Sequence, residues 1–105
     1  MVFGRRSRRL SYKLQISPQV REHQTTLGPQ SRRAVKQAIW NLAEERGDVL
    51  ALRDKLAGFH RLRIGRHRLI FRYQPGRVIQ CVYLNERSLV YELFEAEMAR
   101  ILGQK

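Results

Sequence analysis

Cysteine and acidic residues are both scarce in this chain. The single cysteine, Cys81, excludes an intramolecular disulfide and lies in an apolar run, so we expect it to be a buried small hydrophobic residue. A chain without disulfides suits a reducing compartment, and we therefore expect a cytoplasmic protein. Asp and Glu number 9 against 21 Lys and Arg, which gives a formal net charge of +12. This excess favours an anionic partner, and nucleic acid is the large anion that fits best.

Features that mark several other protein classes are missing as well. No apolar run approaches the ~20 residues that a membrane helix needs. The opening sequence MVFGRRSRRL has no apolar segment behind its arginines, so it does not resemble a secretion signal. Three histidines, one cysteine and no clustered carboxylates argue against a metal site. We therefore expect no metal, no cofactor and no membrane partner.

The length of 105 residues fits one domain. We expect residues 1–9 to form a basic arm and residues 10–105 to form a single domain. The arm carries four arginines, and we expect either a frayed terminus or a tail that grips RNA.

The first half of the domain predicts one strand and two helices. Apolar residues alternate over residues 10–16, as in a strand with one buried face. Ser17 followed by proline predicts the cap of a helix over residues 18–27. A second helix is predicted over residues 29–46, with Gly47 as its C-cap. Its expected buried stripe is Val35, Ala38, Ile39, Leu42 and Ala43, with Trp40 partly buried beside it.

The second half predicts three strands and a last helix. Residues 48–58 are expected to form a connector with a single helical turn, in which Leu52 and Leu56 plug the edge of the core. A hairpin follows, then a strand over residues 77–84 that is rich in Val, Ile and Tyr, and a short helix over residues 95–102. Runs of one element type predict an α+β fold. We expect an antiparallel sheet of about four strands in the order β-α-α-β-β-β-α, with the two N-terminal helices packed on one face.

The hairpin is the most informative segment of the chain. Its sequence, FHRLRIGRHRLIFRY over residues 59–73, alternates between polar and apolar residues. Gly65 and Arg66 form a natural two-residue turn, which places Arg63 opposite Arg68. One face then carries Phe59, Arg61, Arg63, Arg68, Ile70 and Arg72, and the other carries Leu62, Ile64, Leu69, Phe71 and Tyr73. We expect the helices to cover the second face and to leave the first, which has no acid to neutralise it, open to an anion.

Two segments resemble the RelE/ParE superfamily of small bacterial toxins. The first is LAGFHRLRIGRHRLIFRY, residues 56–73, which is similar to the arginine-rich hairpin of that family. The second is NERSLVYELFEAEMARIL, residues 85–102, which resembles the end of the RelE branch in its Glu-Arg-Ser triplet, its Val-Tyr pair and its final short helix. The expected order of elements also agrees with the family.

The resemblance implies a ribosome-dependent mRNA endonuclease, the toxin of a type II toxin–antitoxin system. Such an enzyme cleaves mRNA in the ribosomal A site without a metal, because the 2′-hydroxyl of the substrate attacks the adjacent phosphate and leaves a 2′,3′-cyclic phosphate. The implied partners are mRNA, the ribosome with its 16S and 23S rRNA, and an acidic antitoxin that forms a hetero-oligomer with the toxin. Fixed cations at the phosphate would stabilise the charge that gathers in the transition state.

The resemblance also implies roles for individual residues. Arg61 and Arg63 match two basic residues of the family and would clamp phosphate, while Arg68 matches an arginine that contacts the scissile phosphate. Tyr91 matches a tyrosine proposed as a base or a stacking residue, and Arg87 matches a basic residue near the end of the last strand. Further RNA contacts are expected from Arg66, Arg72, Arg77, Tyr83 and Asn85.

Asn85 departs from the family pattern. It stands where the best-known RelE-type toxins carry an arginine credited with the acid role, and an asparagine side chain cannot donate a proton in that way. We expect odd positions of the last strand, including Asn85, to lie on the arginine face. Either Arg87, His60 or His67 takes over the acid role, or cleavage is weak or absent. The default interpretation of both histidines is a structural role on the core side, with satisfied hydrogen bonds.

Two other functions remain compatible with the sequence. One is a ParE-like inhibitor of DNA gyrase, which would share the fold but would not need Tyr91 beside the arginines. The other is a non-catalytic protein that binds RNA or the ribosome, which the asparagine at position 85 favours.

Overall fold

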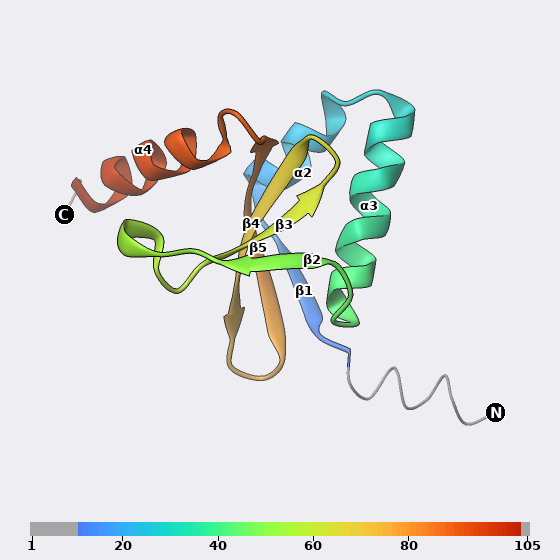
Figure 1. Cartoon of the computed structure of the whole chain (residues 1–105), viewed down its shortest axis with the longest axis horizontal. Coiled ribbons are helices and arrows are strands. Elements are labelled where there is room, and N and C mark those ends of the chain that lie inside the picture. The colour runs from blue at the N-terminus through green and yellow to red at the C-terminus, as the bar shows by residue number, and fades with distance from the viewer. Residues whose placement is uncertain (1–10, 104–105) are drawn as a thin grey trace.

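Five strands form one sheet in the computed structural model, which describes residues 11–103 (Figure 1). The strands lie in the order β1-β5-β4-β3-β2, and β1 pairs in parallel with β5 while the other pairs are antiparallel. Their bounds are β1 Lys13–Ile16, β2 Asp48–Ala51, β3 His60–Ile64, β4 His67–Gln74 and β5 Val78–Glu86. The predicted α+β class is confirmed, but the sheet is mixed and has one strand more than expected.

The additional strand is β2, which the sequence predicted as part of a connector. All four of its residues are exposed, so it shows no alternation between buried and exposed positions. It nevertheless pairs with β3 and forms one edge of the sheet. The predicted helical turn is confirmed as η1 (Asp54–Leu56), and Leu56 is buried as expected.

Helices α2 (Pro18–Thr25) and α3 (Pro29–Ala43) cover one face of the sheet and form the main core with it. Ser17 caps α2 as predicted, because its Oγ accepts a hydrogen bond from the backbone N–H of Val20 at 3.1 Å. The predicted stripe of α3 is confirmed, whereas Trp40 is 67% exposed and not partly buried. The core on this face contains Val20, Val35, Ile39, Leu42, Leu62, Ile64, Leu69, Phe71, Ile79, Cys81 and Leu84.

The end of α3 also differs from the prediction. The helix ends at Ala43 and its C-cap is Glu44, so the expected cap at Gly47 was wrong. Gly47 has φ +137° and a different role, since a Cβ atom there would lie 2.7 Å from Cδ1 of Leu62. Glycine therefore permits the close approach of the chain to the core just before β2 begins.

The N-terminus of α2 also completes the exposed edge of β5. The pairing with β1 reaches only as far as Cys81. Beyond that point, Oγ of Ser17 donates to the carbonyl of Val82 at 2.9 Å. The side-chain amide of Gln19 then binds both backbone groups of Leu84, at 2.8 Å and 2.7 Å. These side chains replace a missing strand neighbour and hold the end of β5 in place.

Helix α4 (Val90–Gly103) begins five residues before the predicted start at residue 95 and packs on the other face of the sheet. Its Val90 and Phe94 form a second core with Leu56, Phe59 and Ile70. Figure 1 shows α3 and α4 on opposite sides of the sheet. The expectation that the helices would leave the arginine face open is therefore wrong for the part of that face under α4.

Some sequence predictions fall outside the described structure. The basic arm of residues 1–9 and residue 10 at the start of the first predicted strand are among them. Met98 in the last helix is partly buried against the second core. Among residues 11–103, none of the helices is long and apolar enough to cross a bilayer.

Candidate nucleic-acid interface

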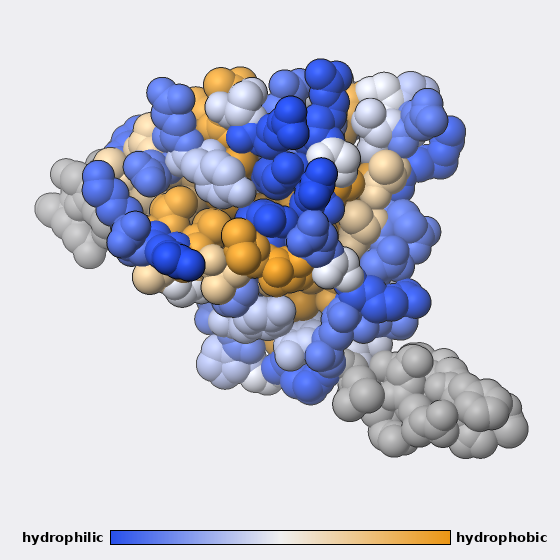
Figure 2. Space-filling model, viewed as in Figure 1, coloured by the Kyte–Doolittle hydropathy of each residue, from blue (hydrophilic) through white to orange (hydrophobic). Residues whose placement is uncertain are grey.

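A row of polar side chains crosses four neighbouring strands near one end of the sheet. The register places Asp48 of β2 beside Arg63 of β3, Arg63 beside Arg68 of β4, and Arg68 beside Asn85 of β5. Adjacent strands lie about 4.8 Å apart, so side chains in one row are neighbours. The predicted pairing of Arg63 with Arg68 is confirmed. Figure 2 shows hydrophilic side chains gathered at the top of this view, above an apolar patch in the middle where Figure 1 places β2.

A second row lies next to the first and on the same face. It runs from Leu50 through Arg61 and Ile70 to Tyr83. Ile70 is fully buried under α4, while Leu50 at the edge is exposed. The two rows together make the arginine face, and its apolar part anchors the helix that carries Tyr91.

Asp48 supplies an acid that the sequence did not predict on this face. Nη1 of Arg61 donates to the backbone carbonyl of Asp48 at 3.1 Å and to its Oδ1 at 3.3 Å. Nη1 of Arg63 lies 3.8 Å from Oδ2 of the same carboxylate. The expectation of an arginine face without an acid was therefore wrong. One carboxylate faces two guanidinium groups, so the trio retains a net positive charge.

Arg68 is the buried cation of the interface. The residue is only 9% exposed, and its Nη1 donates to the carbonyls of Gly65 at 2.9 Å and His67 at 2.8 Å. Within residues 11–103 it forms no ion pair, and its Nη2 and Nε donate to no protein group. A buried charge without a counterion is costly. The site around Arg68 therefore favours an anion that can accept the remaining N–H groups.

Two loops bring further cations to the same end of the sheet. The backbone N–H of Arg87, in the loop after β5, donates to the carbonyl of Arg66 in the β3–β4 turn at 2.8 Å. Both side chains are exposed. Gly65 has φ +59°, as a two-residue turn with glycine in its first position requires. The turn thus fixes Arg66 beside Arg87 and beside the row that contains Arg68.

Tyr91 lies in the first turn of α4, directly after the buried Val90. Its ring is half-buried against the core that α4 shares with the arginine face. The structure therefore brings Tyr91 to the same face as Arg61, Arg63 and Arg68. Asn85 lies in the row of Arg68. Its Oδ1 accepts the N–H of Glu86 at 2.8 Å, so its Nδ2 is the group that can donate to a ligand.

A β-bulge changes the faces of β5. Ile70 pairs with Tyr83 but Phe71 pairs with Cys81, so Val82 is an extra residue. Tyr83 and Asn85 lie on the arginine face as predicted. The predicted parity fails before the bulge, because Ile79 and Cys81 belong to the core under α2 and α3. Burial raises the pKa of the Cys81 thiol to about 12, which agrees with the expected inert residue.

Two predicted RNA-binding arginines lie away from this row. Arg72 stands farther along β4, where its Nε donates to Gln80 at 2.7 Å and its guanidinium lies 5.5 Å from the ring centre of Phe59. Arg77 lies at the opposite turn of the β4–β5 hairpin. Its guanidinium is 4.3 Å from the ring centre of Tyr12 and its Nη2 is 3.5 Å from Glu45.

The histidines considered as acids lie on the face that α2 and α3 cover. His60 stacks on Phe71 with ring centres 5.5 Å apart, and its buried Nδ1 has no hydrogen-bond partner among the described residues. His67 is buried against His23, with ring centres 6.2 Å apart. The core-side location is confirmed, but the expected full hydrogen bonding is wrong for His60. Neither ring reaches the arginine face from there.

Within the described part of the chain, no three His, Cys, Asp or Glu side chains are grouped so as to hold a metal ion. The residues of this face and its surroundings that sequence reasoning missed are Asp48, Phe94 and Glu97. Phe94 had a usable signal, because it follows Val90 at the i, i+4 spacing of a helix face. Asp48 had none, because β2 has no alternating pattern.

Comparisons with known proteins agree on the fold. No family model and no curated protein matches the sequence. A chain of the toxin–antitoxin complex RelBE2 from Mycobacterium tuberculosis is similar in structure, with a TM-score of 0.67 and 23% identity over 75% of this chain and 94% of that one. The archaeal RelE–RelB complex from Pyrococcus horikoshii OT3 is also similar in structure, with a TM-score of 0.60 and 24% identity over 73% of this chain and 96% of that one.

A third similar structure is the YoeB/ParE toxin from Agrobacterium tumefaciens, with a TM-score of 0.59 and 15% identity over 71% of this chain and 98% of that one. The chain therefore has the fold of the RelE and YoeB toxins. At these levels of identity the likeness concerns the fold, and the function has to be argued from the site.

Proposed function

We propose that this protein is the toxin of a type II toxin–antitoxin system and a metal-independent endoribonuclease that cleaves mRNA in the ribosomal A site. The observation that carries the proposal is Arg68, a buried guanidinium without a counterion in the described chain, which lies among arginines on the face where α4 carries Tyr91. The fold shared with RelE and YoeB toxins supports the same conclusion. Arginine binds phosphate through two donors at once, which suits a scissile phosphate better than a single point charge.

The reaction needs no group beyond the RNA and the side chains. The 2′-hydroxyl oxygen of one nucleotide attacks its own 3′-phosphorus, and its proton passes to a base. The bond from phosphorus to the 5′-oxygen of the next nucleotide breaks, and that oxygen takes up a proton. The products are a 2′,3′-cyclic phosphate and a 5′-hydroxyl. Arg68 would stabilise the phosphorane between these steps, because the negative charge there exceeds that of the substrate.

Arg61 and Arg63 would hold the flanking phosphates. Asp48 holds Arg61 by two hydrogen bonds before the substrate arrives, which lowers the entropy that binding has to offset, and its other oxygen lies 3.8 Å from Arg63. The same carboxylate also competes with phosphate for these donors. We infer that Asp48 keeps the clamp ordered at some cost in affinity.

Tyr91 is the proposed base or stacking residue. The second proton, which the leaving 5′-oxygen takes up, has no efficient donor among the residues proposed for that role. Asn85 can donate a hydrogen bond to the leaving oxygen but cannot protonate it. His60 and His67 lie on the opposite face. Of the groups proposed for this role, Arg87 alone remains, and its guanidinium holds its protons too tightly to be an efficient acid. We therefore propose slow cleavage.

Because none of the groups proposed as the acid is efficient, a second function is also a candidate. The protein would bind the ribosome or mRNA through the same arginines without cutting it. The observation that favours it is Asn85 in the row of Arg68. The ends of the RNA distinguish the two functions, because cleavage produces 5′-hydroxyl and 2′,3′-cyclic phosphate ends and binding alone leaves the mRNA intact.

The proposed partner is an acidic antitoxin. One of the similar structures is the toxin–antitoxin complex RelBE2, and another is a complex of RelE with RelB. The formal charge of +12 and the open arginines suit a partner with an acidic segment that folds as it binds.

The test is the addition of the purified protein to a translating extract, followed by mapping of the mRNA ends. We expect cuts at A-site codons with 5′-hydroxyl and 2′,3′-cyclic phosphate ends, and no cut beside a single 2′-deoxynucleotide placed at the attacking position. Intact mRNA on stalled ribosomes would instead establish the binding function. Intact mRNA with loss of DNA supercoiling by gyrase would establish the gyrase-inhibitor function.

A further inference from the structure

A cavity of about 480 Å³ opens on the arginine face between α4, β5 and the start of α2. It lies beside the row that contains Arg61 and Tyr83, and therefore next to the proposed phosphate site. The residues that matter for its chemistry are Phe59, Arg72, Tyr83, Phe94, Glu97 and Met98.

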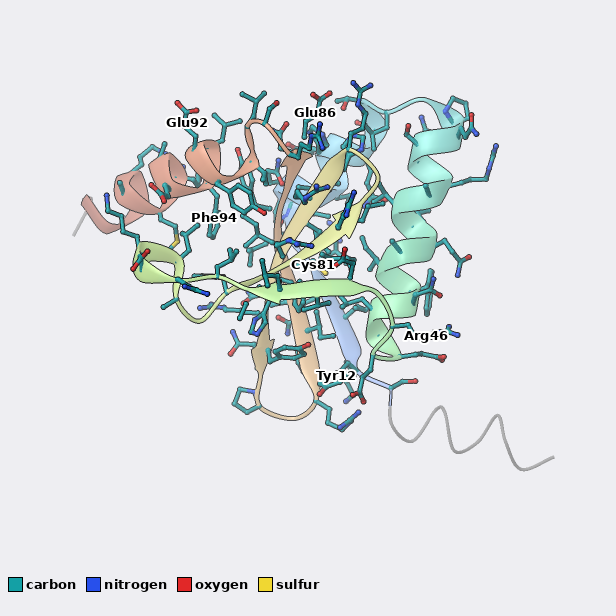
Figure 3. The ribbon with its side chains drawn as sticks, in the orientation of Figure 1. Tyr12, Arg46, Cys81, Glu86, Glu92 and Phe94 are labelled. Atoms are coloured by element: carbon teal, nitrogen blue, oxygen red, sulfur yellow. The ribbon has the colours of Figure 1, made fainter. Side chains whose placement is uncertain are left out.

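Aromatic rings form the inner walls of this cavity. Phe94 points from α4 toward the sheet (Figure 3), where its ring centre lies 5.1 Å from that of Phe59 and 5.7 Å from that of Tyr83. Phe59 and Phe94 are nearly fully buried, so their positions are fixed by the core under α4. The half-buried ring of Tyr83 is the aromatic surface that remains accessible to a flat heteroaromatic ring, which it can bind by stacking.

Two charged groups of opposite sign stand on the polar side of the cavity. Arg72 uses its Nε on Gln80, so its two terminal nitrogens remain available as donors. Glu97 uses its Oε2 on Arg100, so its Oε1 remains available as an acceptor. Burial and the neighbouring Glu97 raise the pKa of Tyr83, so its hydroxyl is protonated at neutral pH. The cavity therefore offers donors and an acceptor to the edge of a flat ring.

Other polar groups in the lining are already occupied. The amide of Gln19 is bound at both ends to Leu84, and the hydroxyl of Ser17 is bound to Val82 and Val20. These groups are therefore not free to bind a ligand, and the selectivity of the cavity would depend on Arg72 and Glu97.

We propose that this cavity binds one base of the RNA strand whose phosphate lies at Arg68, and that Glu97 selects bases with an exocyclic amino group over uracil. The proposal rests on the proposed function for the identity of the ligand as RNA. An amino group of adenine, cytosine or guanine can donate to the free carboxylate oxygen, as acidic side chains do with cytosine in nucleic-acid grooves. The only donor on uracil lies between two carbonyl oxygens, which a carboxylate repels. Arg72 would bind an acceptor on the same base.

The binding test uses Met98, because the chain has only two methionines and the other is the first residue. The ε-methyl carbons are labelled with ¹³C, and the full chain is titrated with the 5′-monophosphates of the four ribonucleosides. We expect a saturable ring-current shift of the Met98 methyl with AMP, CMP and GMP, and roughly tenfold weaker binding of UMP. Glu97→Gln should remove this difference, because an amide can donate to the uracil oxygens.

The control is Glu92→Gln, which changes the same charge on a side chain that points away from the sheet (Figure 3). It should leave all four titrations unchanged. The absence of a Met98 shift with every nucleotide would overturn the proposal, as would equal binding of the four nucleotides by the unmodified protein. A Met98 shift in a protein that does not cut mRNA would retain the base pocket and reject the proposed nuclease.

The selectivity is tested separately on the ribosome. Single-turnover rates are measured on mRNAs that differ at one A-site base at a time. We expect one position to be cut about tenfold faster with an amino-bearing base than with uracil, and Glu97→Gln to abolish that ratio. Rates that fall equally on all codons in Glu97→Gln would contradict base selection by Glu97.

Discussion

The carboxylate of Asp48 lies 3.3 Å from Nη1 of Arg61, although 13 residues separate the two along the chain. The contact joins the edge strand β2 to β3 and also brings the carboxylate to Arg63 at 3.8 Å. Arg61 is largely covered and Arg63 is exposed, with 17% and 56% of their side chains accessible. The carboxylate of Asp48 thus lies between the two arginines that are proposed to bind phosphate.

Removal of that acid should strengthen RNA binding. In Asp48→Asn the two guanidinium groups lose their internal counterion, so they can neutralise additional phosphate. We expect tighter binding of single-stranded RNA and a plot of log K against log salt that is steeper by about 0.7. Asp54→Asn is the matched control, because Asp54 is exposed, forms no ion pair among the described residues and has a positive φ that asparagine tolerates. Equal slopes for Asp48→Asn and Asp54→Asn would show that Asp48 does not compete with phosphate for the two guanidinium groups.

Asn85→Arg should speed cleavage. Asn85 lies in the row of Arg68, where a cation would stabilise the charge on the leaving oxygen. We expect a rise of at least about tenfold in the single-turnover rate, since a positioned electrostatic donor contributes roughly 10²–10³-fold. Gln30→Arg adds the same charge at an exposed position of α3 and should leave the rate unchanged. An unchanged or slower rate in Asn85→Arg would mean that a cation at this position does not stabilise the leaving oxygen.

His23 should make the fold less stable in mild acid. Burial and the neighbouring His67 lower the pKa of His23, with a smaller opposing effect of Glu86. The unfolded chain, with a histidine pKa near 6.5, then binds more protons than the folded one. The free energy of unfolding should therefore fall as the pH drops below about 6.5 and level off below the folded pKa. Urea unfolding at a series of pH values should show this slope, and His23→Gln should flatten it.

The thiol of Cys81 should be silent in the folded protein. It is fully buried and its pKa is raised to about 12, so the reactive thiolate is nearly absent at neutral pH. A thiol reagent at pH 8 should label the protein only as fast as the chain unfolds, and 6 M urea should make labelling immediate. Rapid labelling without denaturant would contradict the burial of this residue.

The sequence predicted the hairpin register because a two-residue turn at Gly65 leaves one pairing, and so Arg63 and Arg68 were placed together correctly. It did not predict β2, because every residue of that strand is exposed and the strand shows no alternation between buried and exposed positions. The parallel pairing of β1 with β5 depends on how α2 and α3 carry the chain across the sheet, which residue patterns do not encode.

The sequence predicted which residue types form the candidate site, but it did not predict the packing around them. Alternation assigns Arg68 to a face but does not show that α4 covers that face, nor that Gly65 and His67 supply carbonyls to its guanidinium. The position of α4 follows from Val90 and Phe94, which bury against Ile70 and Phe59. The aromatic cavity results from this packing, so it was not visible in the strand pattern.

The most direct test of the account is the single-turnover rate of A-site mRNA cleavage by Arg68→Gln and Tyr91→Phe. The matched controls are Arg33→Gln, at an exposed position of α3, and Tyr73→Phe, on the opposite face of the sheet. Circular dichroism and urea unfolding show whether each variant is folded. We predict that both site variants fold and lose roughly 10²-fold or more in rate, while both controls keep full activity. Folded Arg68→Gln and Tyr91→Phe proteins that cut as fast as the controls would contradict the assignment of the scissile phosphate to the arginine face.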